Sequence, residues 1–101
     1  MVLENAIVLI AGNRRETLRI PGCAPATLWC AMDEKSSAFF SHIGEDSALL
    51  CLNRAVSLPG GVLEPQERRV PYDRGRTVEE NLLSAVKRTI TQAAGGGEGS
   101  G

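Results

Sequence analysis

The residues best suited to covalent chemistry are a single histidine and three cysteines. His42 is the only histidine, and the thiols belong to Cys23, Cys30 and Cys51. A cysteine whose proton is taken by a neighbouring imidazole is an effective nucleophile, and a turn at 44–46 could bring His42 and Cys51 onto adjacent strands. Spacing does not show that the two share a face, and isolated cysteines commonly pack as small hydrophobic groups. A thiol-dependent enzyme is therefore the least favoured of three functional hypotheses.

The same side chains do not form a metal-binding pattern. No two of the cysteines stand at the short paired spacing of structural zinc ligands. An odd number of cysteines without a C-x-x-C motif also argues against a disulfide framework and favours a reducing compartment. We expect no metal, no cofactor, and a location in the cytoplasm or another reducing intracellular compartment.

Arginine is the residue type whose distribution could form a binding site. The sequence has nine arginines and two lysines. The guanidinium group is the better fork for carboxylates and phosphates, although GC-rich coding would give the same ratio. Arginine pairs flank Pro71 and Tyr72, and the Tyr72 ring could stack on a base. The candidate polyanion-binding residues are Arg14, Arg15, Arg68, Arg69, Tyr72, Arg74 and Arg76.

Two observations weaken this second hypothesis, binding of RNA or another polyanion. The segment that holds most of these arginines also contains Glu64, Glu67 and Asp73, so ion pairs on a solvated surface explain the charges more simply. The net charge is −1, whereas nucleic-acid-binding domains are usually basic. Nucleic-acid binding is therefore possible but not favoured.

The aromatic residues indicate a different kind of surface. Trp29 is the only tryptophan, and in a strand over 26–32 it points away from the side of Leu28. If no helix covers the side on which Trp29 lies, Trp29 together with Phe39 or Phe40 forms an exposed aromatic anchor of the kind found at interaction hot spots. If the helix does cover it, Trp29 belongs to the core. The sequence leaves both alternatives open.

One amphipathic helix is the best-defined element that could position these groups. Thr77 and Glu80 form a T-x-x-E capping box, and apolar residues recur at three- and four-residue intervals along 77–94. Gly95 follows as a stop, suited to a left-handed C-terminal cap. Such a helix alone is marginally stable in water. We therefore expect its apolar stripe to cover one face of a sheet formed by residues 1–76.

Short strands separated by turns are predicted before the helix. The apolar run at 6–11, the turn at 12–15 and the alternating segment 16–20 indicate a β-hairpin. Segments 26–32 and 37–43 indicate a third and a fourth strand. Segment 47–58 suits a strand or a buried helix, which periodicity does not distinguish, and we interpret it as a strand.

The remaining segments are predicted to lie outside the core. Residues 59–75 are rich in proline, glycine and charge and predict a long surface loop with a short edge strand at 67–70. Residues 95–101 predict a flexible Gly-rich tail or linker. The globular domain is thus expected to be single and to span 1–94.

The length and hydropathy of the chain restrict its class further. No apolar run approaches the length of a membrane-spanning helix, and the apolar N-terminus lacks the basic region of a signal peptide. We expect no membrane association. The order of elements predicts an α+β domain, an antiparallel meander of four to five strands with one C-terminal amphipathic helix packed on one face.

Such a sheet has one face that the helix does not cover. Our first hypothesis follows from it: a non-enzymatic protein-interaction or assembly module. We expect it to self-associate as a homo-oligomer, or bind a protein partner, through the open face or an edge strand.

Overall fold

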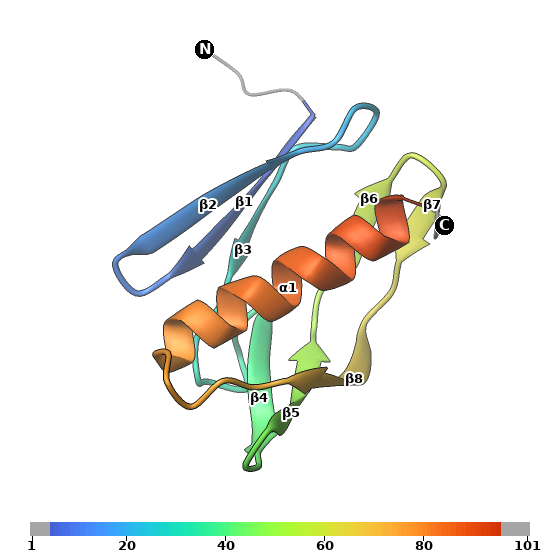
Figure 1. Ribbon diagram of the computed structural model, residues 1–101. Coiled ribbons are helices and arrows are strands. Elements are labelled where there is room, and N and C mark those ends of the chain that lie inside the picture. Colours follow the sequence, from blue (N-terminus) through green and yellow to red (C-terminus); the bar gives the residue numbers. More distant parts are fainter. Residues whose placement is uncertain (1–4, 96–101) are drawn as a thin grey trace.

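A computed structural model describes residues 5–95 of the chain. The described part has eight short strands followed by one helix: β1 (Ala6–Ala11), β2 (Arg14–Arg19), β3 (Ala26–Trp29), β4 (Ala38–Ile43), β5 (Ser47–Leu52), β6 (Val56–Leu58), β7 (Gly61–Leu63), β8 (Gln66–Pro71) and α1 (Val78–Ala94). The predicted α+β class is confirmed, with a single C-terminal helix packed against strands (Figure 1). The tail predicted from 96 onward and residues 1–4 lie outside the described part.

The first sheet has the strand order β2–β1–β3. The predicted hairpin is confirmed as the antiparallel pair β1–β2, and Gly12 turns it with a φ of +60°. This positive φ favours glycine because it has no Cβ. β3 pairs with β1 in parallel, which differs from a simple meander, since the chain crosses over through 20–25 before pairing.

The second sheet is antiparallel, with the order β4–β5–β8. A parallel bridge between Cys30 and Ala38 joins β3 to β4, so the two sheets form one curved layer. The edge strand predicted at 67–70 is confirmed as part of β8. The rest of 59–75 is less irregular than predicted, because β6 and β7 form a small hairpin around Pro59–Gly60.

Segment 47–58 is strand rather than helix, but it is divided into β5 and β6. Asn53 lies at the break. Its side-chain amide donates to the carbonyls of Glu34 at 2.8 Å and Ser36 at 3.0 Å, and its backbone N–H donates to Ser37 at 2.8 Å. Leu52 pairs with Ala38, the first residue of β4, so the ladder ends there and these bonds hold the chain against the β3–β4 loop.

The helix begins as predicted and ends differently. The Thr77 hydroxyl accepts the Glu80 N–H at 3.1 Å, and the Glu80 carboxylate accepts the Thr77 N–H at 3.0 Å, which completes the capping box. The predicted left-handed cap is wrong: Gly95 has a φ of −75° and continues the right-handed turn, donating to the Thr91 carbonyl at 2.8 Å.

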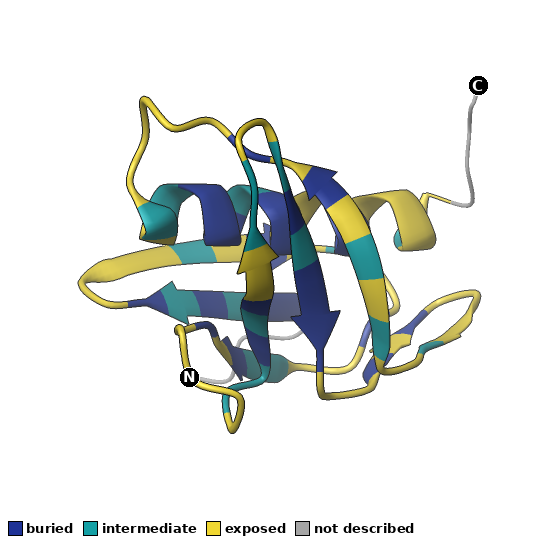
Figure 2. Cartoon of the chain, turned by 90° about the horizontal axis from the view of Figure 1, so that it is seen from below, coloured by how far each residue is buried: buried dark blue, intermediate teal, exposed yellow. Residues whose placement is uncertain are grey.

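The core lies between the curved layer and α1. Leu82, Val86 and Ile90 of the helix are fully buried, as are Leu9 and Leu50 from the two sheets. Figure 2 shows a mostly buried β5 between β4 and β8. Along β8, half-buried and exposed residues alternate up to the buried Val70. We call the side of the layer that faces α1 the inner side, and the opposite side the outer side.

A buried asparagine fixes the connection into the helix. Asn81 is 4% exposed. Its amide nitrogen donates to the carbonyls of Asp73 at 2.8 Å and Thr77 at 2.9 Å, and its oxygen accepts the Asp73 N–H at 2.8 Å. Because each polar atom has a partner, burial of this side chain is not costly, and the 73–77 turn is tied to the first turns of α1.

Candidate interaction surface

The outer side of β2–β1–β3 carries the exposed tryptophan. Along β1 and β3 the inner residues Ile7, Leu9 and Leu28 are at most 1% exposed, whereas Trp29 is 58% exposed. Side chains alternate between the two sides of a strand, so the register gives the members of the outer side. We call them the Trp29 face: Ala6, Val8, Ile10, Arg15, Thr17, Arg19, Thr27 and Trp29.

The Trp29 face has an apolar middle and a basic margin. The half-buried Val8 and Ile10 lie in its central strand, and Arg15 and Arg19 lie along β2. The carboxylate on this strand, Glu16, lies on the inner side and pairs with Lys87 at 3.2 Å. The Trp29 face itself therefore has two guanidinium groups and no carboxylate.

Arg54 extends this margin on the side of β3. It lines an open hollow together with Val8, Pro25 and Trp29, and its Nη1 donates to the Thr27 carbonyl at 2.9 Å. Sequence reasoning missed Arg54, because only the break after β5 brings it to β3. No local pattern could have indicated this contact.

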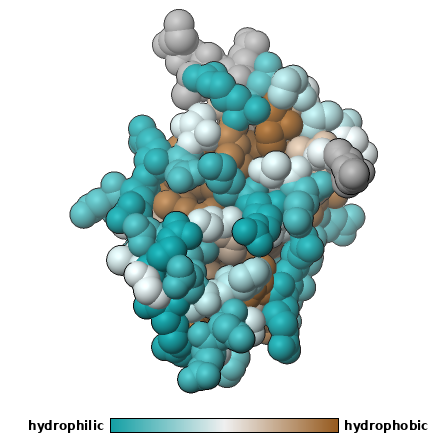
Figure 3. All heavy atoms as spheres, viewed as in Figure 1, coloured by the Kyte–Doolittle hydropathy of each residue, from teal (hydrophilic) through white to brown (hydrophobic). Residues whose placement is uncertain are grey.

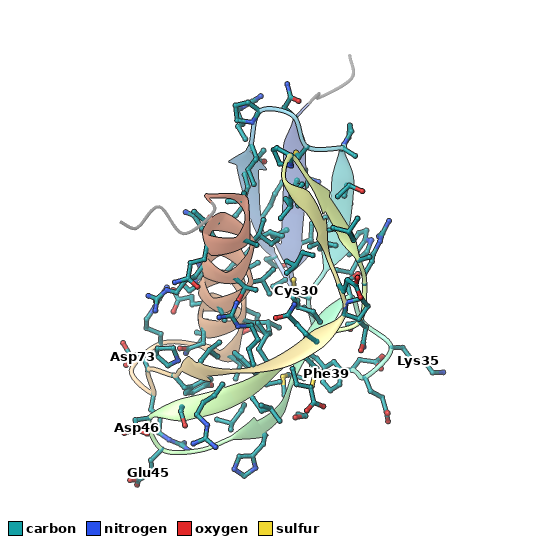
Figure 4. All side chains as sticks on the ribbon, turned by 90° about the vertical axis from the view of Figure 1, so that its right-hand side faces the viewer. Cys30, Lys35, Phe39, Glu45, Asp46 and Asp73 are labelled. Carbon is teal, nitrogen blue, oxygen red and sulfur yellow. The ribbon has the colours of Figure 1, made fainter. Side chains whose placement is uncertain are left out.

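The two phenylalanines of β4 point to opposite sides. Phe39 is half-buried and pairs with Cys51 on the outer side, whereas Phe40 is 3% exposed and belongs to the core. The bridge between Cys30 and Ala38 puts Phe39 on the same side of the layer as Trp29. In Figure 4, Cys30 lies in the interior and Phe39 near the periphery. Of the three predicted aromatic anchors, two thus share the outer side.

The arginines predicted to bind polyanions do not form one cluster. Arg14 pairs with Glu80 at 3.1 Å, and Arg76 approaches the same carboxylate at 4.0 Å. Arg15 lines the groove beside this carboxylate, but it alternates with Arg14 along β2 and belongs to the outer side, so only two of the candidates lie at the acid. A carboxylate at the centre of this group makes it a poor site for a polyanion.

The remaining polyanion candidates are dispersed. Arg68 and Arg69 lie on opposite sides of β8, and Arg74 donates to the Gly44 carbonyl at 2.8 Å. Tyr72 is 9% exposed and packs edge-on against Phe40, with 5.6 Å between ring centroids. Its ring is therefore in the core and not on the loop surface where a base could stack.

The candidate nucleophile and base share a side without contact. His42 and Cys51 both lie on the outer side of β4–β5, but the register pairs His42 with Leu49 and Cys51 with Phe39. The Cys51 thiol lies 3.7 Å from the Glu67 carboxylate, to which it donates a hydrogen bond. A thiol bonded to a carboxylate instead of an imidazole does not have the geometry of an activated nucleophile.

The other thiols are also unsuited to catalysis. Burial raises the pKa of Cys30 to about 11, and Cys23 is 5% exposed. Within residues 5–95, no three His, Cys, Asp or Glu side chains cluster closely enough to hold a metal ion.

Comparison with known proteins identifies no relative from which a function could be proposed. No known family model, curated protein or solved structure matches the chain. In the described part of the chain, no helix is long and apolar enough to cross a membrane.

Proposed function

We propose that the chain is a non-enzymatic protein-interaction module that self-associates through the Trp29 face. The observation that carries the proposal is Trp29, which is 58% exposed beside half-buried Val8 and Ile10 on a side of the sheet that α1 does not cover. Large exposed aromatic residues with an apolar surround are typical of binding hot spots. The α1 side is the weaker candidate, because polar side chains dominate it and apolar atoms are recessed between them (Figure 3).

A two-fold axis parallel to β1 makes the Trp29 face self-complementary. Ile10 is paired with Arg15 on one side and with Trp29 on the other. A two-fold rotation about this axis, placed over Ile10, brings Arg15 of the first copy over Trp29 of the second copy. It also brings Arg15 of the second copy over Trp29 of the first. A guanidinium over an indole ring contributes about 0.5–2 kcal/mol, and a closed dimer makes this contact twice.

The edges of β2, β3 and β4 are poorer sites for self-association. Arg54 covers the edge of β3 at Thr27, β4 has a bulge between Phe40 and His42, and β2 carries charges over Arg14–Arg19. Charges and bulges on edge strands hinder pairing with another chain. We therefore place the contact on the face.

The size of the face sets the expected affinity. Three strands about 4.8 Å apart, with about 3.3 Å per residue, give a footprint of roughly 300 Å² per copy. Stable interfaces bury about 800 Å² per partner. Even if the contact extends to Phe39, we expect a weak dimer with a dissociation constant in the high micromolar range.

Sedimentation velocity tests this proposal. Between about 10 µM and about 1 mM, the wild-type chain should shift from monomer towards dimer. Trp29→Ser should weaken the association by at least about a hundredfold, since each copy loses a hot-spot side chain. Val62→Ser is the matched control, because Val62 is also 58% exposed but lies on the β6–β7 hairpin. A wild-type chain that stays monomeric throughout, or equal effects of both substitutions, would contradict the proposal.

Polyanion binding is the alternative proposal, and salt separates it from self-association. Arg15 and Arg19 lie on the same face as Trp29, across β1 from it, without a carboxylate on that face, an arrangement that could hold a single-stranded nucleic acid. Binding of a polyanion weakens steeply as salt rises, because counterions are released. A dimer that brings basic margins together should instead strengthen, because salt screens their repulsion.

A further inference from the structure

A groove lies between the end of β8 and the helix, away from the Trp29 face. α1 packs mainly against β1, β2, β4 and β5, and the space beside β8 is left open to a volume of about 220 Å³. Its floor is apolar, formed by the buried Val70, Tyr72 and Ala85. The exposed Arg76 and Arg88 lie at its margin.

The free edge of β8 offers backbone hydrogen-bonding groups beside this groove. The Tyr72 N–H donates to the Asp46 carbonyl at 3.0 Å, which makes this a hydrogen-bonded pair. Such pairs alternate along an antiparallel ladder, so the register directs the N–H and C=O groups of Glu67 and Arg69 away from β5. Pro71 occupies the same type of position, where its missing N–H costs no ladder bond.

Two other polar side chains of the groove, Asn81 and Asp73, already have partners. Asn81 uses its amide in the 73–77 turn, and the Asp73 carboxylate accepts the Gly75 N–H at 2.8 Å. Arg76 reaches Glu80 only at 4.0 Å, and no ion pair involves Arg88 within residues 5–95. The two guanidinium groups are therefore the groups best placed to take an anionic ligand.

We propose that this groove binds a short extended peptide segment of a partner protein. The segment pairs with the free edge of β8, sets apolar side chains on Val70, Tyr72 and Ala85, and places a carboxylate between Arg76 and Arg88. Strand addition of this kind takes affinity from main-chain bonds and specificity from pockets. Guanidinium groups bind carboxylates through strong charge-assisted bonds.

A peptide fits this groove better than a nucleic acid does. A free strand edge has main-chain donors and acceptors at the spacing of another strand, which a phosphate backbone cannot match. A nucleic acid would also approach Asp73 within the groove and Glu80 beside it. Two arginines near two acids supply too little positive charge to hold a chain of phosphates.

A nuclear magnetic resonance titration of the isotope-labelled chain tests the proposal. The probe is a peptide of about six residues that alternates valine and threonine and ends in a free carboxylate. Three matched probes are compared with it. The first has a C-terminal amide and no acid, the second has a C-terminal amide and one internal glutamate, and the third has N-methyl groups on the backbone edge that would pair with β8. The titration uses Trp29→Ser protein, so self-association through the Trp29 face does not contribute.

The proposal predicts a defined pattern of binding. The two acidic probes, one with a free C-terminal carboxylate and one with an internal glutamate, should shift the Glu67 and Arg69 amide signals. The probe that binds more tightly shows whether a chain end or a side chain supplies the carboxylate. The acid-free amide should bind at least about tenfold more weakly, as should the best probe with Arg76→Gln or Arg88→Gln. Lys35→Gln, an exposed cationic residue on the β3–β4 loop outside both proposed surfaces, should leave the affinity unchanged.

Several results would overturn the proposal. They are equal binding of acidic and acid-free probes, equal binding of the N-methylated probe, no effect of either groove substitution, and no saturation by about 10 mM peptide. Displacement of the peptide by oligothymidylate would identify a polyanion site instead. None of these outcomes depends on the sedimentation result, because the groove and the Trp29 face share no residue.

Discussion

Glu80 links the start of α1 to the β1–β2 hairpin. The Thr77 backbone N–H, followed by the positive charges of Arg14 and Arg76, lowers the pKa of the Glu80 carboxyl below 4.5. Because the pKa in the folded state is below that in the unfolded state, the ionised carboxylate stabilises the fold fully above pH 4.5. This contribution is lost as the pH falls through the lowered folded value.

Replacement of Glu80 tests this linkage. Glu80→Gln should reduce the free energy of unfolding at neutral pH, and its difference from wild type should shrink as the pH is lowered past 4.5. Urea denaturation at a series of pH values measures the difference. Glu79→Gln, in the same helical turn but outside the capping box, is the control and should change the pH dependence less. A difference that grows towards acid pH would contradict the assignment.

The three thiols should behave as packing groups. Cys23, Cys30 and Cys51 are all buried, and the pKa of Cys30 is raised to about 11. Iodoacetamide at neutral pH should therefore alkylate the folded chain slowly and the urea-unfolded chain rapidly, since the thiolate is the reactive form. Mass spectrometry over time measures the rates. One fast thiol in the folded chain that is slowed by His42→Gln would restore the thiol-enzyme hypothesis.

At the scale of elements, Asn81 has a larger structural role than its place in the helix suggests. Asn81→Ala should lower the free energy of unfolding by roughly 1–3 kcal/mol, because it removes the side-chain hydrogen bonds to the 73–77 turn and leaves the Asp73 N–H without its partner. Thr91→Ala, an exposed position on the same helix, should change it by less than about 0.5 kcal/mol. Chemical denaturation of both variants measures the contrast, and equal effects would refute the anchoring role.

Elements governed by local interactions were predictable from the sequence. The Thr77–Glu80 capping box needs only residues three apart, and the β1–β2 hairpin needs only the turn at Gly12. The alternation of side chains along the strand at 26–29 also predicted that Trp29 and Leu28 lie on opposite sides of the sheet. Whether the helix covered the side of Trp29 depended on the packing of the whole chain, so the sequence left it open.

Features governed by distant contacts were not predictable. Segment 47–58 divides where its partner β4 ends, and Asn53 anchors the break to Glu34 and Ser36, which no periodicity reveals. We expected Tyr72 on a loop surface, but its N–H bonds to the Asp46 carbonyl and extends the β5–β8 ladder by one pair, so its ring lies on the inner side with Val70 and packs on Phe40. The proposed groove arises in the same way, since the 73–77 turn sets α1 beside β8.

At the scale of the molecule, the two proposed surfaces differ in how they respond to salt. Raising the salt concentration from about 50 mM to about 500 mM should strengthen association through the Trp29 face, because screening reduces repulsion among Arg15, Arg19 and Arg54. The same change should weaken peptide binding between Arg76 and Arg88, because screening reduces attraction. Sedimentation and peptide titration across the salt series measure the two trends. Weaker self-association at high salt would contradict the assigned face.

The most direct test of the central claim uses Trp29 itself. It is the only tryptophan in the sequence, so emission excited at wavelengths that Tyr72 does not absorb reports on the proposed interface alone. As concentration rises from about 10 µM to about 1 mM, its emission should move to shorter wavelength and its quenching by acrylamide should fall, with Val62→Ser protein behaving like wild type. Emission and quenching that stay constant while sedimentation shows a dimer would place the contact elsewhere and contradict the account.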